Sequence, residues 1–248
     1  MDSAIDVFKH TTTITFDCYG TLIDWSAGLW RSFAEIFGPV IADHKQEWFE
    51  AYVRVEAEVE SGPYRSYREV LGVVTERLAG QFDLPLPPGR EAKLAEMLPG
   101  WAPFPDTNDA LARLKQRFRL GVLSNIDRDL FAGTAKQFDV AFDFVVTAED
   151  VCSYKPAHGH FQHLIDAHGG VSQLASSALP SRGHRLSALH VAQSLYHDGA
   201  PANELGLAFV WINRYKERNH TSVRPLAEFP DLRSFADAAC GARRNPSR

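Results

Sequence analysis

The stretch TITFDCYGTLID, residues 13–24, decides how the rest of the chain is organised. Its first four residues are apolar or β-branched, which is the composition of a strand buried in a parallel sheet. The run stops at a carboxylate, Asp17, and a turn residue, Gly20, follows. Because open α/β sheets hold their ligands at the carboxyl ends of strands, Asp17 is predicted to face a substrate. On this stretch alone, a turn in which Asp17 only caps the next segment remains the alternative.

Helical periodicity replaces the strand pattern directly after this stretch. Apolar residues recur every three or four positions through residues 29–37, 43–62 and 67–82, and no strand pattern interrupts them. Two proline-rich stretches, residues 84–90 and 98–106, then mark the return from this region. The sequence therefore predicts roughly 70 residues of helix inserted behind Asp17, where they can close over it as a lid.

The remainder of the chain alternates strand and helix patterns. Right-handed crossovers between such strands would make the sheet mostly parallel. We therefore predict an α/β fold, with a Rossmann-like parallel-sheet core and an inserted all-helical cap domain. The core is expected to comprise residues 1–21 and 100–248, and the cap residues 22–99. Further strands are expected at residues 119–126, 142–150, 186–194 and 205–214.

Composition narrows the partners and the compartment. The chain has 248 residues, a net charge of −5 and three cysteines. This acidic balance gives no reason to expect a nucleic-acid partner or a membrane surface. No apolar run reaches the ~20 residues that a membrane span needs, and the first residues lack the pattern of a signal peptide. The cysteines have no metal-type spacing, and their odd number fits a reducing compartment, so a cytoplasmic protein is expected.

Polar side chains follow each of the later strands, where they could join Asp17. Taken one at a time, each has a structural alternative as a turn former, a solvated charge or a helix cap. Because the carboxyl ends of parallel strands meet at one edge of a sheet, their joint occurrence predicts a single site. The residues concerned are Ser124, Asn125, Lys155, Gln193, Ser194 and Asp198.

The segments DCYGTLID, LSN, YKP and the stretch from Ser194 to Asp198 resemble, in this order, the four motifs of the haloacid dehalogenase (HAD) superfamily. The resemblance spans essentially the whole chain, with a helical cap between the first two motifs, as in subfamily I. It implies that Asp17 is the nucleophile, that Lys155 steadies its charge, and that Asp198 is the late acidic residue of the fourth motif. The residues implied to hold the anionic group of the substrate are Thr21, Ser124 and Asn125.

Two positions favour dehalogenation over phosphate hydrolysis within this resemblance. Phosphatases of the superfamily generally carry a second Asp two residues after the nucleophile, which protonates the leaving alkoxide. Here Tyr19 stands at that position, as in 2-haloacid dehalogenases. The fourth motif of the phosphatases resembles Gly-Asp-Ser-x-x-x-Asp and helps to hold Mg²⁺, whereas Gln193 replaces its first acid here. Since halide leaves as a stable anion, it needs neither group.

The expected reaction converts a short 2-haloalkanoic acid into a 2-hydroxy acid through an ester on Asp17, which water activated by Asp198 then hydrolyses. The expected partner is a small anionic substrate, without cofactor or metal, and a homodimer is a candidate assembly because subfamily relatives are often dimers. A cap arginine often takes the departing halide; Arg54 is the first candidate and Arg31 the second, with a plain surface arginine as the alternative for each. The residues expected to line the substrate are Tyr19, Arg54, Gln193 and Ser194.

Two departures and two alternatives qualify this prediction. Haloacid dehalogenases commonly show Ser-x-Asn in the fourth motif, where this chain has Gln193 and Leu195. Phe161 takes the position, six residues after Lys155, at which haloacid dehalogenases commonly have Tyr, so a hydroxyl is missing. The competing enzyme is a small-molecule phosphatase of the same superfamily, dependent on Mg²⁺ and using another acid. A binding or regulatory protein with this fold is the third reading, and the retained charges of Asp17, Lys155 and Asp198 argue against it.

Overall fold

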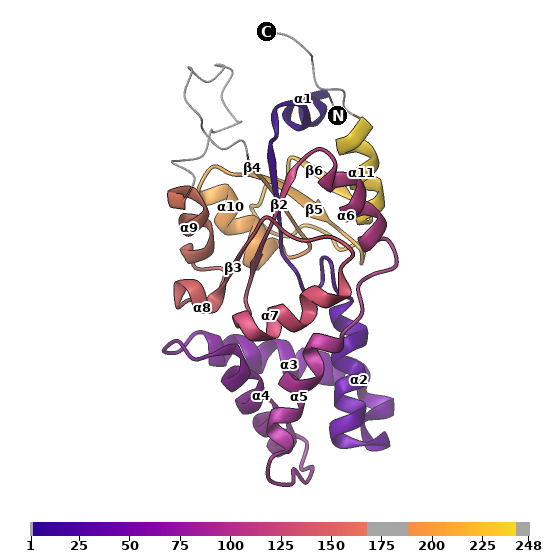
Figure 1. Ribbon diagram of the computed structural model, residues 1–248. Helices are drawn as coiled ribbons and strands as arrows, with labels where there is room; N and C mark the ends of the chain where they lie inside the picture. Colours follow the sequence, from indigo (N-terminus) through magenta and orange to yellow (C-terminus); the bar gives the residue numbers. More distant parts are fainter. Residues whose placement is uncertain (1, 168–187, 242–248) are drawn as a thin grey trace.

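The computed structural model describes residues 2–167 and 188–241, and it confirms the predicted α/β fold (Figure 1). Within these residues a six-stranded sheet has the order β3-β2-β1-β4-β5-β6, and every neighbouring pair of strands is parallel. The chain order of the strands reverses direction at β1, and in such sheets the ligand crevice lies at this switch point. The strands are β1 (Thr13–Phe16), β2 (Arg119–Ser124), β3 (Phe144–Thr147), β4 (Ala188–Ala192), β5 (Ala208–Ile212) and β6 (Ala227–Phe229).

The sequence predicted five of these strands and missed β6. This edge strand has only three residues, none of them fully buried, so it carries no periodic pattern that could be read from the sequence. The strand predicted at residues 142–150 is also shorter than expected. It ends at Thr147, whose side chain accepts a hydrogen bond from Asp150 N and starts a short helix that carries the two acidic residues.

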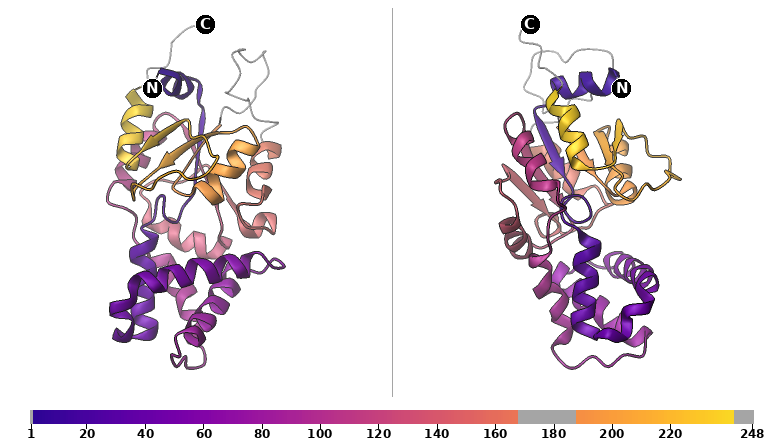
Figure 2. Two further views of the ribbon diagram at one scale, coloured as in Figure 1. Left: turned by 180° about the vertical axis from the view of Figure 1, so that it is seen from behind. Right: turned by 90° about the vertical axis from the view of Figure 1, so that its right-hand side faces the viewer.

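The two faces of the sheet are buried against different helices (Figure 2). Side chains alternate between the faces, so that Val122 belongs to one apolar cluster and Leu123 to the other. Helices α1 (Asp2–His10), α6 (Thr107–Lys115), α7 (Arg128–Thr134) and α11 (Leu232–Gly241) contribute to the first cluster. Helices α9 (Gly159–Ala167) and α10 (Ala200–Glu204) contribute to the second, and α8 (Ala148–Val151) follows β3. Among the described residues, no helix combines the length and the apolar character needed to cross a membrane.

The predicted helical insert lies beside the edge of the sheet at which β1 ends (Figure 1). Its interior is aromatic: Trp48 stacks on Phe82 with ring centroids 4.3 Å apart, and Phe33 packs on Trp48 at 5.3 Å. The three helices expected from periodicity are present. The helices of the insert are α2 (Trp25–Phe37), α3 (Lys45–Glu60), α4 (Tyr67–Gln81) and α5 (Lys93–Met97), with the short 3₁₀ turns η1 (Pro39–His44), η2 (Arg90–Ala92) and η3 (Leu98–Gly100).

The chain enters and leaves the insert through two segments that are hydrogen-bonded to each other. Asp24 N donates to Ala102 O at 2.9 Å, and Phe104 N donates to Leu22 O at 3.0 Å. The loop that carries Asp17 is therefore tied to the segment that returns from the insert.

A buried ion pair reinforces this junction. Arg214 donates to Asp106 Oδ1 at 3.0 Å and to Thr21 O at 3.0 Å, and its guanidinium lies 3.9 Å from the centre of the Phe104 ring. The other oxygen of Asp106 accepts from Leu232 N at 2.7 Å, at the start of α11. Burial alone would raise the pKa of Asp106, but the hydrogen bond and the charge of Arg214 lower it below its ordinary value.

Replacing this carboxylate tests the junction. Asp106→Ala leaves the largely buried Arg214 unpaired, and we expect the free energy of unfolding to fall by about 3 kcal/mol. Because the pKa of Asp106 is lowered in the folded state, its contribution is complete above the unfolded pKa of about 4 and is lost as pH falls further. Urea unfolding of both proteins from neutral pH to about pH 3 should therefore show the difference shrinking at the acidic end.

Asp109→Ala is the matched control, because Asp109 makes an exposed ion pair with Arg113 on the same helix, α6. We expect this change to lower the free energy of unfolding by less than about 0.5 kcal/mol. Equal effects of the two substitutions would contradict a structural role for the buried pair.

Candidate active site

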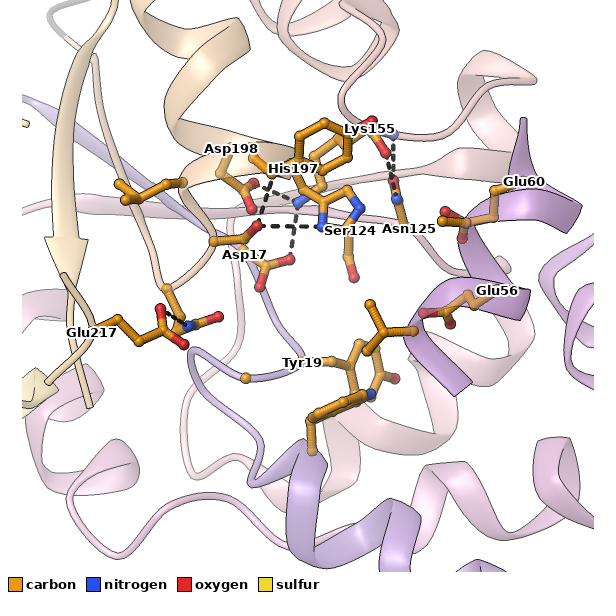
Figure 3. A pocket seen from close by; sticks show the side chains of 18 of the residues that line it. Asp17, Tyr19, Glu56, Glu60, Ser124, Asn125, Lys155, His197, Asp198 and Glu217 are labelled. Atoms are coloured by element: carbon orange, nitrogen blue, oxygen red, sulfur yellow. Dashed lines mark hydrogen bonds and ion pairs between the residues drawn. The ribbon is translucent and has the colours of Figure 1, made fainter. Parts of the chain in front are cut away.

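A cavity of about 680 Å³ lies between the carboxyl edge of the sheet and helix α3 of the insert (Figure 3). Residues from the ends of neighbouring strands reach it, as the sequence predicted: Asp17 follows β1, Ser124 ends β2, and Asp198 follows β4. These strands flank the point at which the strand order reverses. The other residues that were predicted from the sequence and that line the cavity are Tyr19, Asn125, Lys155, Gln193 and Ser194.

The Lys155 ammonium is the centre of the charged network. Its Nζ donates to Asp17 Oδ1 at 2.9 Å, to Asp198 Oδ1 at 2.6 Å and to Leu123 O at 2.9 Å. These three bonds use every proton of the ammonium, and the side chain is only 1% exposed. Burial alone would lower the pKa of Lys155, but the two carboxylates raise it to about 12. Lys155 therefore remains a cation at neutral pH.

The Asp17 carboxylate is fixed from both sides but keeps an open face. Oδ2 accepts from the Thr21 hydroxyl at 3.0 Å, and Oδ1 accepts from Lys155. Thr21 Oγ1 in turn accepts from Gln193 N at 3.0 Å, so Thr21 orients Asp17 and is not itself a lining residue. Burial and the nearby Asp198 carboxylate raise the pKa of Asp17, and Lys155 opposes this shift. A carboxylate with a raised pKa is the better nucleophile once it is ionised.

Asp198 is the more strongly stabilised carboxylate of the pair. Its Oδ1 accepts from Lys155 and from His190 Nε2, the latter at 2.9 Å. Burial would raise the pKa of Asp198, but the Lys155 ammonium and the His190 hydrogen bond hold it well below its usual range. The second oxygen, Oδ2, is buried and has no partner among the described residues. It is available to accept a proton or a hydrogen bond from a molecule in the cavity.

The two polar residues at the end of β2 differ in what they can offer. Ser124 Oγ is buried, has no hydrogen-bond partner within the described chain, and belongs to a residue that lines the cavity. The Asn125 amide, by contrast, is engaged: its Nδ2 donates to Lys155 O at 3.0 Å and its Oδ1 accepts from Lys155 N at 2.7 Å. Asn125 therefore fixes the backbone of the lysine, and the expected anion contact falls to Ser124.

The Tyr19 ring lines the cavity while its hydroxyl points elsewhere. The hydroxyl donates to Thr134 Oγ1 on α7 at 2.7 Å, and Thr134 donates onward to Leu130 O. Burial raises the pKa of Tyr19 well above its ordinary value. The residue two positions after Asp17 therefore offers an aromatic surface to the cavity and no acid.

The fourth motif forms a tight turn at the end of β4. Ser194 Oγ accepts from His197 N at 3.0 Å and so caps η5 (Leu195–Gly199), one turn of π-helix that carries Asp198. Gln193 Nε2 donates to Glu217 Oε2 at 3.2 Å. Both Gln193 and Ser194 line the cavity, but these bonds engage their side chains with the protein itself.

The expectation that a cap arginine faces the site is wrong. Arg54 is exposed and donates to Gln81 Oε1 at 2.7 Å, and Arg31 is exposed on α2; neither lines the cavity. The reason is helical phase, because successive residues of α3 point about 100° apart. The face of α3 that does line the cavity consists of Val53, Glu56, Ala57 and Glu60.

Three features of the site were missed from the sequence. His190 was assigned no role, although a histidine inside a buried strand needs partners and so carried a signal. It lies opposite Thr15 in the sheet register, and Thr15 Oγ1 lies 2.9 Å from His190 Nδ1. The acids Glu56 and Glu60 of α3 and the loop of residues 215–221 after β5 gave no comparable signal, because only the folded chain brings them to the cavity.

Comparisons with known proteins agree with this fold. The family model of haloacid dehalogenase-like hydrolases matches residues 11–175. The L-2-haloacid dehalogenase of Xanthobacter autotrophicus has a solved structure similar to this one, with a TM-score of 0.75 and 18% identity, covering 93% of this chain and 99% of its own. The structure of a second L-2-haloacid dehalogenase is similar with a TM-score of 0.74 and 22% sequence identity, covering 92% of this chain and 98% of its own. The structure of a HAD-hydrolase of Bacillus subtilis bound to magnesium is similar with a TM-score of 0.73 and 19% sequence identity. The match covers 91% of this chain and 96% of that chain. No curated protein matches the chain.

The charged network predicts an unusual response to pH when its cation is removed. Lys155→Met leaves two buried carboxylates without their common partner, and we expect it to lower the free energy of unfolding at neutral pH by about 3 kcal/mol. Without the ammonium, the folded-state pKa values of Asp17 and Asp198 would lie above the unfolded values. The penalty is therefore complete at high pH and shrinks as pH falls toward about 4.

Urea unfolding of Lys155→Met between neutral pH and about pH 4 measures this effect, with Lys115→Met as control. Lys115 forms a partly exposed ion pair with Asp143, for which we expect less than about 1 kcal/mol. A Lys155→Met protein whose penalty grew on acidification would contradict the assignment of the charges.

Proposed function

The chain belongs to the haloacid dehalogenase-like hydrolases, and from this premise we propose that it hydrolyses the carbon–halogen bond of 2-haloalkanoic acids. The observation that carries the proposal is the state of Tyr19, two residues after the nucleophile. Its hydroxyl is bonded to Thr134 and its pKa is raised by burial, so it cannot protonate a leaving group next to Asp17. An alkoxide would need that proton, whereas a halide leaves as a stable anion.

In the first step, an oxygen of Asp17 attacks C2 of the substrate. The new C–O bond forms as the carbon–halogen bond breaks, and the halide departs with the electron pair, so that C2 is inverted. Ser124 Oγ, buried and without a protein partner, is the donor available for the substrate carboxylate. A structure of the Xanthobacter autotrophicus enzyme with chloropropionic acid covalently bound supports an intermediate of this kind.

In the second step, water attacks the Asp17 carbonyl carbon of the ester. The water gives its proton to Asp198, whose Oδ2 has no partner in the described part of the chain. Lys155, already bonded to Asp17 Oδ1, stabilises the oxyanion that forms. Collapse of this intermediate breaks the bond between the Asp17 carbonyl carbon and the ester oxygen on C2, and that oxygen takes the proton held by Asp198. The 2-hydroxy acid leaves with an oxygen that came from Asp17, and Asp17 keeps the oxygen of the water and is ionised again once its remaining proton passes to solvent.

The Mg²⁺-dependent phosphatase is less well supported by the donor set. Asp17 and Asp198 each bond the Lys155 ammonium, and Gln193 supplies an amide where the phosphatases have a carboxylate. Within the residues that the structure describes, no group of three or more His, Cys, Asp or Glu side chains is arranged to hold a metal ion. These residues do not fit Mg²⁺, and no step is assigned to it.

Halide release tests the proposal. The purified protein should release chloride from one enantiomer of 2-chloropropionate, and the L form is the first choice because the similar solved structures are L-2-haloacid dehalogenases. Release should be insensitive to EDTA and should be lost in Asp17→Asn, because the amide is not a nucleophile. Asp24→Asn is a matched control, since Asp24 caps α2 and does not line the cavity.

The opposite outcome is equally specific. If no haloacid releases halide, while a phosphate ester releases phosphate only with Mg²⁺ and not after EDTA treatment, then the protein is a phosphatase and the proposal is wrong.

A second experiment examines His190 as a positioning residue for Asp198. His190→Leu removes one hydrogen bond to a charged group, worth about 1.5 kcal/mol, so we expect kcat to fall about tenfold. KM should stay within about twofold, because His190 does not line the cavity. His190→Gln retains an amide donor and should recover part of kcat. A fall in stability with no change in kcat would show that His190 only packs.

A further inference from the structure

The insert presents two carboxylates to the cavity from one face of α3. Glu56 and Glu60 are four residues apart, so they are neighbours on the helix surface, and both line the cavity opposite Ser124 and Asp17 (Figure 3). Like charges at this spacing destabilise a helix. Both nevertheless lie on the cavity face of α3, where an arginine was expected.

Neither carboxylate has a cationic partner among the described residues. Glu56 Oε1 accepts from the hydroxyls of Tyr52 and Tyr67, at 2.5 and 2.7 Å, and both donors are neutral. Within the described chain, the Glu60 carboxylate makes no hydrogen bond or ion pair. The charge of Lys155 acts on it, but Lys155 already donates all its protons elsewhere.

The pKa values of Glu56 and Glu60 reflect this lack of a cationic partner. Burial first, and then the charge of Glu56, raise the pKa of Glu60 to about 9. Burial also raises the pKa of Glu56, although its two tyrosine partners oppose the shift. The two carboxyl groups therefore lie in partly buried surroundings with little compensating positive charge.

The surroundings of the pair suit an organic cation. The rings of Tyr67, Trp25 and Tyr19 line the same cavity, and aromatic faces attract ammonium groups. At about 680 Å³ the cavity falls within the range of sites for drug-sized ligands, well above the needs of a short haloalkanoate. At the other end of the cavity, Ser124 is 1% exposed and its Oγ has no hydrogen-bond partner in the described chain. This hydroxyl can therefore donate to a ligand there.

We propose that Glu56 and Glu60 form a subsite for an ammonium group of the substrate. The assignment of the reacting end rests on the proposed function. The substrate class is then a 2-halo carboxylic acid that also carries an amine, separated from C2 by several methylene groups. Its carboxylate lies near Ser124 and its ammonium donates to the Glu60 carboxylate, with Glu56 and the aromatic rings completing the subsite.

Binding of the charged end can be measured without turnover. Calorimetric titration of the wild-type protein with propylammonium chloride, compared with 1-propanol, isolates the contribution of the charge. We expect propylammonium to bind about tenfold or more tightly than the alcohol, and Glu60→Gln to remove this preference. Glu58→Gln is the matched control, because it removes the same charge from an exposed position on the same helix, where Glu58 pairs with Arg77. It should leave binding unchanged.

The stability of Glu60→Gln separates loss of binding from loss of folding. Because the folded-state pKa of Glu60 is raised, its charge destabilises the protein above the unfolded pKa of about 4.3. The urea midpoint of Glu60→Gln at pH 7.5 should therefore equal or exceed that of the wild type. Propylammonium that bound no more tightly than 1-propanol, or that bound Glu60→Gln and wild type alike, would overturn the subsite.

The reaction provides a separate arm. 6-Amino-2-chlorohexanoate and 2-chlorohexanoate differ only in the amine, and we expect kcat/KM to favour the amine about tenfold in the wild type and not in Glu60→Gln. Equal halide release from both substrates would overturn the subsite while leaving the proposed function intact. Glu60-dependent binding of propylammonium with no halide release from either compound would retain the subsite and reject the dehalogenation.

Discussion

One buried ammonium holds the active-site end of the sheet together. Lys155 bonds the carboxylate that follows β1, a carbonyl near the end of β2 and the carboxylate that follows β4. Moving such ions out of water costs several kcal/mol each, and mutual attraction offsets this only with good geometry and further hydrogen bonds. The surrounding residues supply these bonds: Thr21 to Asp17, and His190 to Asp198. The sheet order is what makes this possible, because β2 and β4 flank β1.

The assembly of the site at the carboxyl ends of neighbouring strands explains why so much of it could be predicted from the sequence. The polar residues follow runs of buried strand residues, and the carboxyl ends of parallel strands must meet at one edge. The sequence therefore predicted one site made of Asp17, Ser124, Lys155 and Asp198. The helices of the insert were predictable for a similar reason, since an apolar stripe with helical period must face a core, as Trp48 does.

What could not be predicted depends on helical phase and on loops. A shift of one residue along α3 turns a side chain by about 100°, so Arg54 points to α4 while its neighbour Val53 lines the cavity. Hydrophobic periodicity predicts which face of each helix is buried inside the insert. It does not predict which polar residue faces the sheet. That depends on the rotation of the insert against the sheet, which is set by contacts distant in sequence, such as the Tyr67 N donation to Asp127. The loop of residues 215–221 has no periodic pattern at all.

The same chemical demand can be met from a different part of the fold. Haloacid dehalogenases commonly have a tyrosine at the position of Phe161, and the lost hydroxyl suggested a weakened site. Here Phe161 is fully buried and packs its ring against that of His190, with centroids 5.0 Å apart and planes at 83°. His190 donates to Asp198, so the strand β4 supplies a donor that the helix α9 lacks. Phe161 therefore packs against the imidazole that donates to Asp198. Among the described residues that line the cavity, five carboxyl groups face two permanent cations, Lys155 and Arg218, so a substrate with a positive group beside its carboxylate would offset more of the negative charge than a simple haloalkanoate does.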